Sequence, residues 1–144
     1  MIAIGSDHGG YELKSVIIKE LTEISFKDYG TFSTDSVDYP DIAISLAEDV
    51  ASGKVEKGIL ICRSGVGMDI MANKVKGIRA ALCFNSKIAE MAKRHEDVNI
   101  ITLPADYITK DEAIDIVNAW LENDFDGERH QRRIDKIKSY EERM

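Results

Sequence analysis

The chain has 144 residues, of which 44% are hydrophobic and 31% charged, a composition typical of one globular domain. Its 26 acidic and 19 basic residues leave a net charge of −7 at pH 7, which argues against nucleic-acid binding. No apolar run approaches the roughly 18 residues of a membrane span, and no signal peptide is visible at the amino terminus. The two cysteines, Cys62 and Cys83, are too few for a disulfide scaffold. We therefore expect a single cytoplasmic domain over residues 1–144, with both thiols free.

The first half of the chain alternates strand and helix patterns. The apolar run 1–4 predicts a strand, and apolar residues at helical spacing over 13–21 predict a helix. A short strand over 25–29 follows, then a polar loop over 31–41 and a helix face over 43–50. Residues 57–62 are almost continuously apolar, as in a strand covered on both faces. A glycine-containing turn leads from there into a short helix that ends at Asn73.

The second half continues this alternation. Strands are expected over 78–83 and 98–103, with a helix between them that carries His95 on its apolar face. Thr109 and Glu112 have the spacing of a capping box and predict the start of the next helix. A highly charged helix over about 128–143 ends the chain. Because this helix has few apolar residues, we expect it to pack on a second subunit.

Five strands alternating with helices predict an α/β fold with an open parallel sheet and right-handed crossovers. Ligands of such sheets bind beyond the carboxyl ends of the strands, near the point where the strand order reverses. With the order 2-1-3-4-5, the loops after the first and third strands lie side by side. Asp7 and His8 then face Cys62 and the glycines that follow it.

The turn over residues 62–67 can bind an anion. Its glycines allow several N–H groups to point at one position, next to the positive end of a helix. Such a turn suits a phosphate, a carboxylate or an enediolate oxyanion, although it can also be a simple strand–helix connection. A dinucleotide fingerprint requires a small residue at position 70, which is Ile, and no Walker lysine motif is present.

Three side chains near this turn have two interpretations each. Cys62 is either a reactive thiolate, favoured by the helix start and by Arg63, or a small buried apolar residue. Cys83 is expected in the core. Asp7 and His8 form an acid/base pair in principle; alternatively, Asp7 caps the next helix and His8 is merely exposed.

Histidine and arginine supply the remaining candidates. His8, His95 and His130 are far apart and lack the spacing of metal ligands, so we expect no zinc site. His95 alone reads more readily as a core or capping residue than as a functional one. Arg129 and Arg133 lie four residues apart on one helix face, and guanidinium groups suit phosphate. The alternative is a solvated face paired with neighbouring carboxylates.

Several motifs occur together and in order along nearly the whole chain. They are GSDHGG over 5–10, Leu13-Lys14, DYPD over 38–41, GILIC over 58–62, SGVGM over 64–68, ANK over 72–74, GIRAA over 77–81, Arg94-His95 with Asn99, and GERHQRR over 127–133. Jointly they resemble the type B ribose-5-phosphate isomerases and the related galactose-6-phosphate isomerase subunits.

The resemblance implies a Rossmann-like three-layer α/β/α domain that forms a homodimer or a dimer of dimers with shared active sites. It implies conversion of an aldose phosphate to its ketose through a cis-enediolate, as in the pentose phosphate pathway, without metal or cofactor. By position, the resemblance implies that Cys62 is the base that moves the proton between C1 and C2. By position, the resemblance also implies that the N–H groups of Ser64, Gly65, Val66 and Gly67 bind the enediolate, and that Asp7, Ser64 and His95 orient the sugar or open its ring. Asn73 and Asn99 are expected to line the site. His8 and the partner subunit's Arg129 and Arg133 are expected to bind the phosphate, with His130 nearby.

The sequence departs from the family pattern at several positions. Met68 stands where a second branch has a catalytic glutamate, and Asp69, where Ser is common, is a reserve base that we expect to point elsewhere. Ser64 replaces the commoner Thr. Arg63 stands where Gly is usual, and Asp106 where an arginine often contacts phosphate. We hypothesise that Arg63 supplies the missing positive charge.

The expected substrate pair is ribose 5-phosphate and ribulose 5-phosphate. A six-carbon aldose 6-phosphate, such as allose or galactose 6-phosphate, is the alternative within the same chemistry. A non-catalytic phosphosugar-binding homologue is the alternative outside it. A nucleotide-binding Rossmann domain is disfavoured by the missing glycine.

Overall fold

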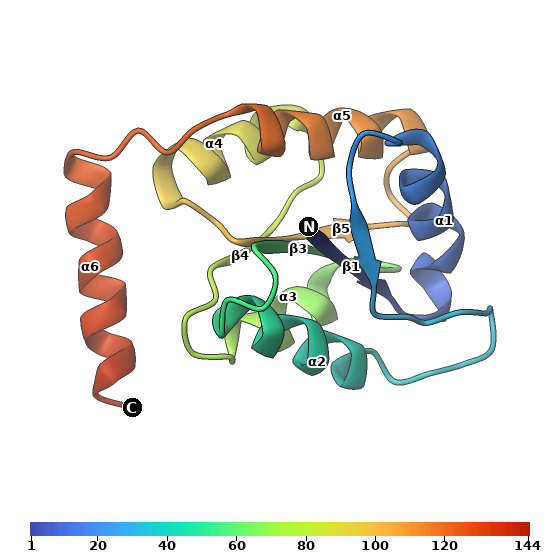
Figure 1. Ribbon diagram of the computed structural model, residues 1–144, viewed down its shortest axis with the longest axis horizontal. Coiled ribbons are helices and arrows are strands. Elements are labelled where there is room, and N and C mark those ends of the chain that lie inside the picture. Colours follow the sequence, from blue (N-terminus) through green and yellow to red (C-terminus); the bar gives the residue numbers. More distant parts are fainter.

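The computed structural model describes residues 1–144 and has a five-stranded parallel sheet between two layers of helices (Figure 1). The strands are β1 (Ile2–Ser6), β2 (Phe26–Asp28), β3 (Lys57–Cys62), β4 (Ala80–Leu82) and β5 (Ile100–Pro104). The helices are α1 (Tyr11–Glu20), α2 (Tyr39–Ala51), α3 (Val66–Asn73), α4 (Ser86–Glu96), α5 (Lys110–Glu122) and α6 (Arg129–Glu142), and a 3-10 turn, η1 (His8–Gly10), precedes α1. The expected fold class is confirmed.

The strand order is β2-β1-β3-β5-β4, so the order 2-1-3-4-5 was wrong at one edge. Every residue of β5 is buried, whereas the three residues of β4 are all partly exposed. The more apolar strand therefore occupies the inner position beside β3, and β4 lies at the edge. The predicted neighbourhood of the first and third strands is confirmed by the pairing of Ser6 with Ile61. The loop after β5, and not the one after β4, lies next to Cys62, since Cys62 pairs with Pro104.

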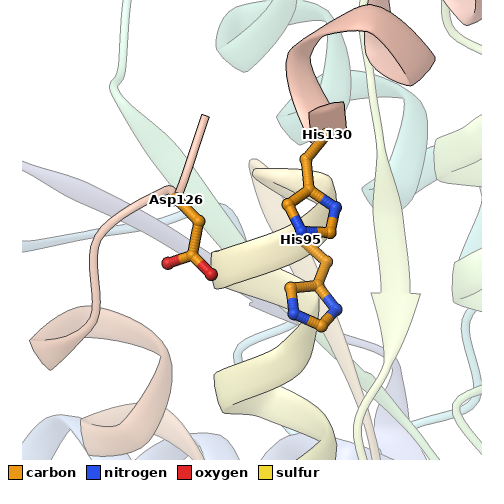
Figure 2. Close-up of side chains that lie close together, drawn as sticks. All are labelled: His95, Asp126 and His130. Atoms are coloured by element: carbon orange, nitrogen blue, oxygen red, sulfur yellow. The ribbon is translucent and has the colours of Figure 1, made fainter. Parts of the chain in front are cut away.

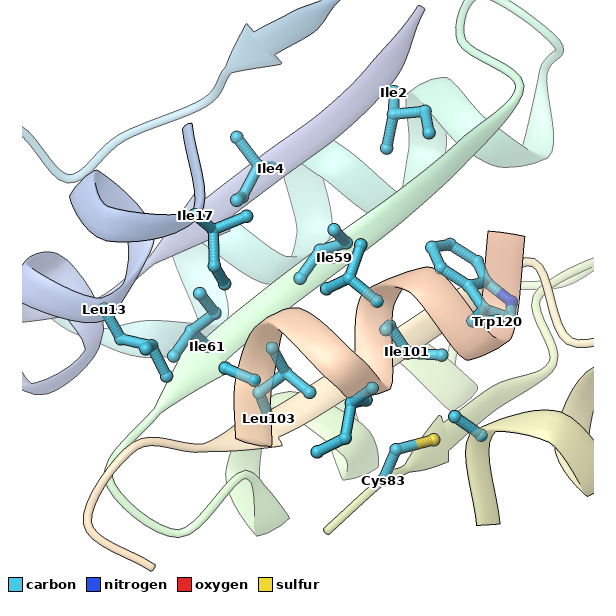
Figure 3. Packing of buried hydrophobic residues seen from close by; sticks show 14 of the residues in the cluster. Ile2, Ile4, Leu13, Ile17, Ile59, Ile61, Cys83, Ile101, Leu103 and Trp120 are labelled. Carbon is cyan, nitrogen blue, oxygen red and sulfur yellow. The ribbon is translucent and has the colours of Figure 1, made fainter. Parts of the chain in front are cut away.

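Each face of the sheet packs against its own layer of helices. Helices α1, α4 and α5 cover one face, where Ile59, Ile61 and Trp120 belong to the larger apolar cluster (Figure 3). Helices α2 and α3 cover the other face, where Leu60 and Cys62 belong to the second cluster. This alternation follows from the two-residue period of a strand. It places the Cys62 side chain on the α3 side of the sheet.

Helix α6 stands beside the rest of the fold and covers no face of the sheet (Figure 1). Its buried residues are His130 and Ile134, both in its first half, whereas Ile137 and Tyr140 are exposed. A hollow of about 480 Å³ lies between the second half of α6 and the segment around β4. None of the helices combines the length and apolar character that a membrane crossing requires.

The predicted elements agree with the observed ones apart from their ends. Strands β4 and β5 start two residues later than expected, because Asn99 and Arg79 bond to each other there outside the strands. The predicted capping box is confirmed: the Thr109 hydroxyl accepts from the N–H of Glu112, whose carboxylate accepts from the N–H of Thr109.

Substitution Thr109→Ala tests the contribution of this cap. Loss of the hydroxyl leaves an N–H of the first turn without its partner and is expected to lower the free energy of unfolding by about 1 kcal/mol. Urea unfolding monitored by circular dichroism measures the change. Thr22→Ala is the matched control, since Thr22 is exposed and caps no helix. Equal stability of the two variants would contradict the role of the cap.

Candidate functional site

The turn after β3 combines a thiol with unpaired backbone donors. Cys62 is 5% exposed, and its Sγ accepts from the Gly65 N–H at 3.2 Å. Gly65 has φ +76°, and a Cβ there would lie 3.2 Å from the Leu103 carbonyl carbon, so only glycine suits this position. The N–H groups of Gly67 and Met68, at the start of α3, have no partner within the chain. An anion placed there would meet both donors and the positive end of the helix.

Two polar side chains border this turn. The Ser64 Oγ accepts from the Val66 N–H at 3.2 Å, which keeps the hydroxyl at the mouth of the turn. The ring of Tyr39, at the first position of α2, lies against Gly67, where an added Cβ would come within 2.7 Å of the ring. Tyr39 belongs to the DYPD motif but was not predicted as a site residue. Only the packing of α2 against α3 reveals it.

Asp7 lies next to Cys62, as the sequence predicted, and His8 follows it in the same loop. The Asp7 N–H donates to the Ile61 carbonyl at 3.2 Å, which places Asp7 beside the end of β3. Its Oδ1 accepts from the Gly10 N–H at 3.1 Å, so the capping interpretation is confirmed, while its Oδ2 has no partner in the chain. His8 Nδ1 accepts from the Val37 N–H at 3.2 Å.

Arg63 and Asp106 pair with each other at the rim of the same site. Arg63 Nη1 lies 3.5 Å from Asp106 Oδ2, and the Asp106 N–H donates to the Arg63 carbonyl at 2.9 Å. The Arg63 side chain runs over Gly9, where a Cβ would collide with it. The charge of Asp106 is thus matched by Arg63, and both side chains are largely exposed.

Asp69 points away from Cys62, as expected. Its Oδ1 accepts from the Thr102 hydroxyl at 3.1 Å, between α3 and β5. Burial raises the pKa of Asp69, and the Thr102 hydrogen bond opposes that shift. Cys83 lies in the core as predicted, and burial, with the charge of Asp69, raises its pKa to about 12. The Cys83 thiol therefore stays protonated at neutral pH.

A second group of candidate residues gathers around the start of α6. The imidazole rings of His95, in the last turn of α4, and His130, in the first turn of α6, stack with centroids 4.3 Å apart and planes 8° from parallel (Figure 2). Burial lowers the pKa of His130, and the charges of His95, Arg129 and Arg133 lower it further. Arg129 and Arg133 are exposed, as the alternative of a solvated face expected, but they form no ion pair, so the expected pairing with neighbouring carboxylates is wrong.

His95, His130 and Asp126 come close enough to suggest a metal site, which their spacing in the sequence did not indicate. Their ligand atoms lie within 4.8 Å of one another. Because the two rings are stacked in nearly parallel planes, however, the lone pairs of their nitrogens do not converge on one ion. Asp126, in addition, already accepts from Arg94 Nε at 3.2 Å. We therefore assign no metal to this cluster.

The two groups lie at opposite ends of the strands. Cys62 ends β3 and pairs with Pro104, whereas His95 lies just before the start of β5 at Ile100. A five-residue strand spans roughly 13–17 Å, so His95 of one chain does not reach its own Cys62. We call the first group the thiol half-site (Asp7, His8, Cys62, Arg63, Ser64, Gly65, Val66 and Gly67) and the second the arginine half-site (His95, Arg129, His130 and Arg133).

Asn73 and Asn99 belong to neither half-site. The Asn73 amide bonds the N–H and carbonyl of Ala80 at 2.9 and 3.0 Å. The Asn99 amide bonds the Arg79 N–H and the Gly77 carbonyl, both at 2.9 Å. Both side chains hold the segment that leads into β4, so within one chain their expected place in the substrate site is not reproduced.

Comparison with known proteins gives a consistent result. The family model described as Ribose/Galactose Isomerase matches residues 2–137. A putative sugar phosphate isomerase of Bacillus subtilis is 47% identical, covering 99% of this chain and 97% of the relative, and ribose-5-phosphate isomerase B of Escherichia coli is 41% identical with the same coverage.

Solved structures agree with these relatives. Ribose-5-phosphate isomerase B of Clostridium thermocellum superposes with a TM-score of 0.96 at 47% identity, covering 99% of this chain and 97% of that one. The Mycoplasma genitalium enzyme, solved with bound ribulose-5-phosphate, gives 0.94 at 41% identity and the same coverage. The chain therefore belongs to the ribose/galactose isomerase family.

Proposed function

We propose that this protein is an aldose–ketose isomerase of phosphorylated sugars that interconverts ribose 5-phosphate and ribulose 5-phosphate in the cytoplasm, without metal or cofactor. The observation that carries the proposal is the Cys62 thiol beside the unpaired N–H groups of Gly67 and Met68. Proton abstraction next to a carbonyl needs a base and a donor for the developing oxyanion, and this turn offers both. Membership of the family and similarity to ribose-5-phosphate isomerases B of other organisms support the substrate class.

Cys62 acts as the base in the proposed mechanism. Its thiolate removes the proton from C2 of the open-chain aldose, the C–H electrons form a C1–C2 double bond, and the carbonyl oxygen on C1 becomes the enediolate oxygen. The thiol then returns the proton to C1, while the proton of the C2 hydroxyl passes to the oxygen on C1, so that C1 carries the hydroxyl and C2 becomes the ketose carbonyl. The Gly65 N–H that points at Sγ stabilises negative charge on sulfur. The N–H groups of Gly67 and Met68 stabilise it on oxygen.

A complete site in this mechanism takes residues from two subunits. The thiol half-site offers His8 toward a phosphate, and its one arginine, Arg63, is already paired with Asp106. The arginine half-site has two unpaired guanidinium groups but no base. We infer that a homodimer joins the thiol half-site of one subunit to the partner subunit's Arg129 and Arg133. Burial of the exposed Ile137 and Tyr140 of α6 against the second copy fits this arrangement.

His95 and His130 then enter the site together. In the proposed dimer the partner subunit's His95 orients the sugar or opens its ring, by proton transfer at the ring oxygen and at the C1 hydroxyl. The stacked His130 ring fixes its position. Holding the phosphate at the far end keeps C1 and C2 against Cys62.

The Arg63–Asp106 pair keeps a six-carbon aldose 6-phosphate as a second candidate substrate. It stands where the related family usually has Gly and an arginine, so the charge at the rim differs from that pattern. Comparison of ribose 5-phosphate with allose 6-phosphate and galactose 6-phosphate as substrates separates the candidates.

Turnover of ribose 5-phosphate in the presence of EDTA tests the proposed activity. The wild-type protein is expected to form ribulose 5-phosphate, and Cys62→Ala is expected to lower kcat by about a thousandfold because the base is lost. Cys83→Ala is the matched control and is expected to retain kcat within about threefold, since the Cys83 thiol lies outside the site. An active Cys62→Ala variant would remove Cys62 from the mechanism.

Substitution Arg63→Ala tests the rim pair. It leaves Asp106 unpaired near the phosphate path and is expected to raise KM by about three- to tenfold through repulsion, with little change in kcat. The double substitution Arg63→Ala/Asp106→Ala is expected to restore most of the loss. Unchanged KM in Arg63→Ala would show that the pair plays no part in substrate binding.

A further inference from the structure

Lys14 is a buried cation that the proposed mechanism leaves without a role. Its side chain, on α1, is 1% exposed, and Nζ donates to Asp28 Oδ1 at 2.7 Å and to the Thr31 carbonyl. The rings of Tyr11 and Phe32 lie 5.5 and 4.9 Å from Nζ. Lysine is rarely this buried, and an ammonium group in such a place needs compensating partners. The positions of these partners show which segment of the chain the Lys14 ammonium group stabilises.

Apart from Tyr11, which lies on α1 itself, the partners of Lys14 belong to the segment that leaves β2. Asp28 is the last residue of β2, and Thr31 and Phe32 lie in the loop over residues 29–38. The Asp28 Oδ1 that accepts from Lys14 also accepts from the Gly30 N–H at 2.8 Å. Lys14 therefore ties the start of this loop to α1, on the side of the sheet opposite α2.

The far end of the same loop touches the thiol half-site. The Val37 N–H donates to His8 Nδ1 at 3.2 Å. A ring nitrogen that accepts a hydrogen bond carries no proton, so the neutral His8 ring carries its hydrogen on Nε2. Only in this tautomer can neutral His8 donate from Nε2 to a phosphate oxygen. The loop thus sets which nitrogen of His8 is the donor.

We propose that Lys14 is a positioning residue that clamps the loop over residues 29–38 and thereby holds His8 with its Nε2–H toward the phosphate of the substrate. The proposal rests on the isomerase function for its kinetic consequence alone. Lys14 contacts neither Cys62 nor the anion-binding turn, so the clamp acts on phosphate binding rather than on proton transfer.

Substitution Lys14→Met tests the clamp, with Lys19→Met as the matched control on the exposed side of the same helix. We expect Lys14→Met to speed hydrogen exchange at the Val37 amide by about tenfold or more, with the amides of β3 unchanged. The ¹⁵N signals of His8 are expected to show a mixture of both tautomers. KM for ribose 5-phosphate and the inhibition constant of inorganic phosphate are expected to rise together by about five- to tenfold, with kcat within about threefold.

Unchanged exchange at Val37 and an unchanged His8 tautomer in a folded Lys14→Met variant would overturn the proposal. A general loss of stability would lower the active fraction and the apparent kcat without raising KM, which separates the clamp from a merely structural role.

If Lys14→Met does not fold, Phe32→Ala replaces it, because Phe32 is 70% exposed and contributes only its ring to the clamp. That variant is expected to speed Val37 exchange at least twofold, and no change would contradict the clamp. If the wild-type protein is not an isomerase, the exchange and ¹⁵N measurements still decide the clamp alone.

Discussion

The parallel direction of the strands is the constraint on which the rest of the structure depends. Because β1, β3 and β5 run in the same direction, their carboxyl ends lie side by side, and the residues that follow them meet there. Cys62 comes next to Asp7 through Ile61 and next to Asp106 through the turn after β5. The same constraint places the residues that precede β5, together with α6, at the opposite, amino-terminal end of the strands (Figure 1).

Each end of the strands carries one half of the groups that a phosphosugar isomerase needs. The thiol half-site has a thiol and unpaired N–H donors, but its one arginine is engaged by a carboxylate. The arginine half-site has unpaired guanidinium groups and two stacked imidazoles, but no thiol. A folded monomer cannot close the roughly 13–17 Å of strand between them, since the sheet itself lies in the way. Association of two copies is the simplest way for both halves to meet one substrate.

The fold was largely predictable because its signals are local. Alternating strand and helix patterns gave the fold class, and the box at Thr109 gave the start of α5. The position of Cys62 at a strand end, close to Asp7, followed from strand order at the β1–β3 junction. The order of β4 and β5 was not predictable by the same reasoning, because it depends on which strand is buried on both faces.

The candidate site was predictable in composition but not in arrangement. The stack of His95 on His130 joins residues from two helices, and no spacing in the sequence indicates it. The amides of Asn73 and Asn99 were expected near the substrate, yet backbone groups around β4 occupy them. The sequence singles out Lys14 only as part of the Leu13-Lys14 motif, and only the path of the loop after β2 shows why it is buried.

Subunit mixing tests the central claim, a site shared between two copies, most directly. Cys62→Ala protein is unfolded, mixed in equal amounts with Arg129→Ala/Arg133→Ala protein and refolded, with each variant refolded alone as the control. Half of the dimers formed at random contain one of each chain, and each of these has one site with both halves intact. The account predicts that the mixture regains about a quarter of the wild-type activity while each variant alone stays inactive. An inactive mixture that contains mixed dimers, shown by native mass spectrometry, would contradict it.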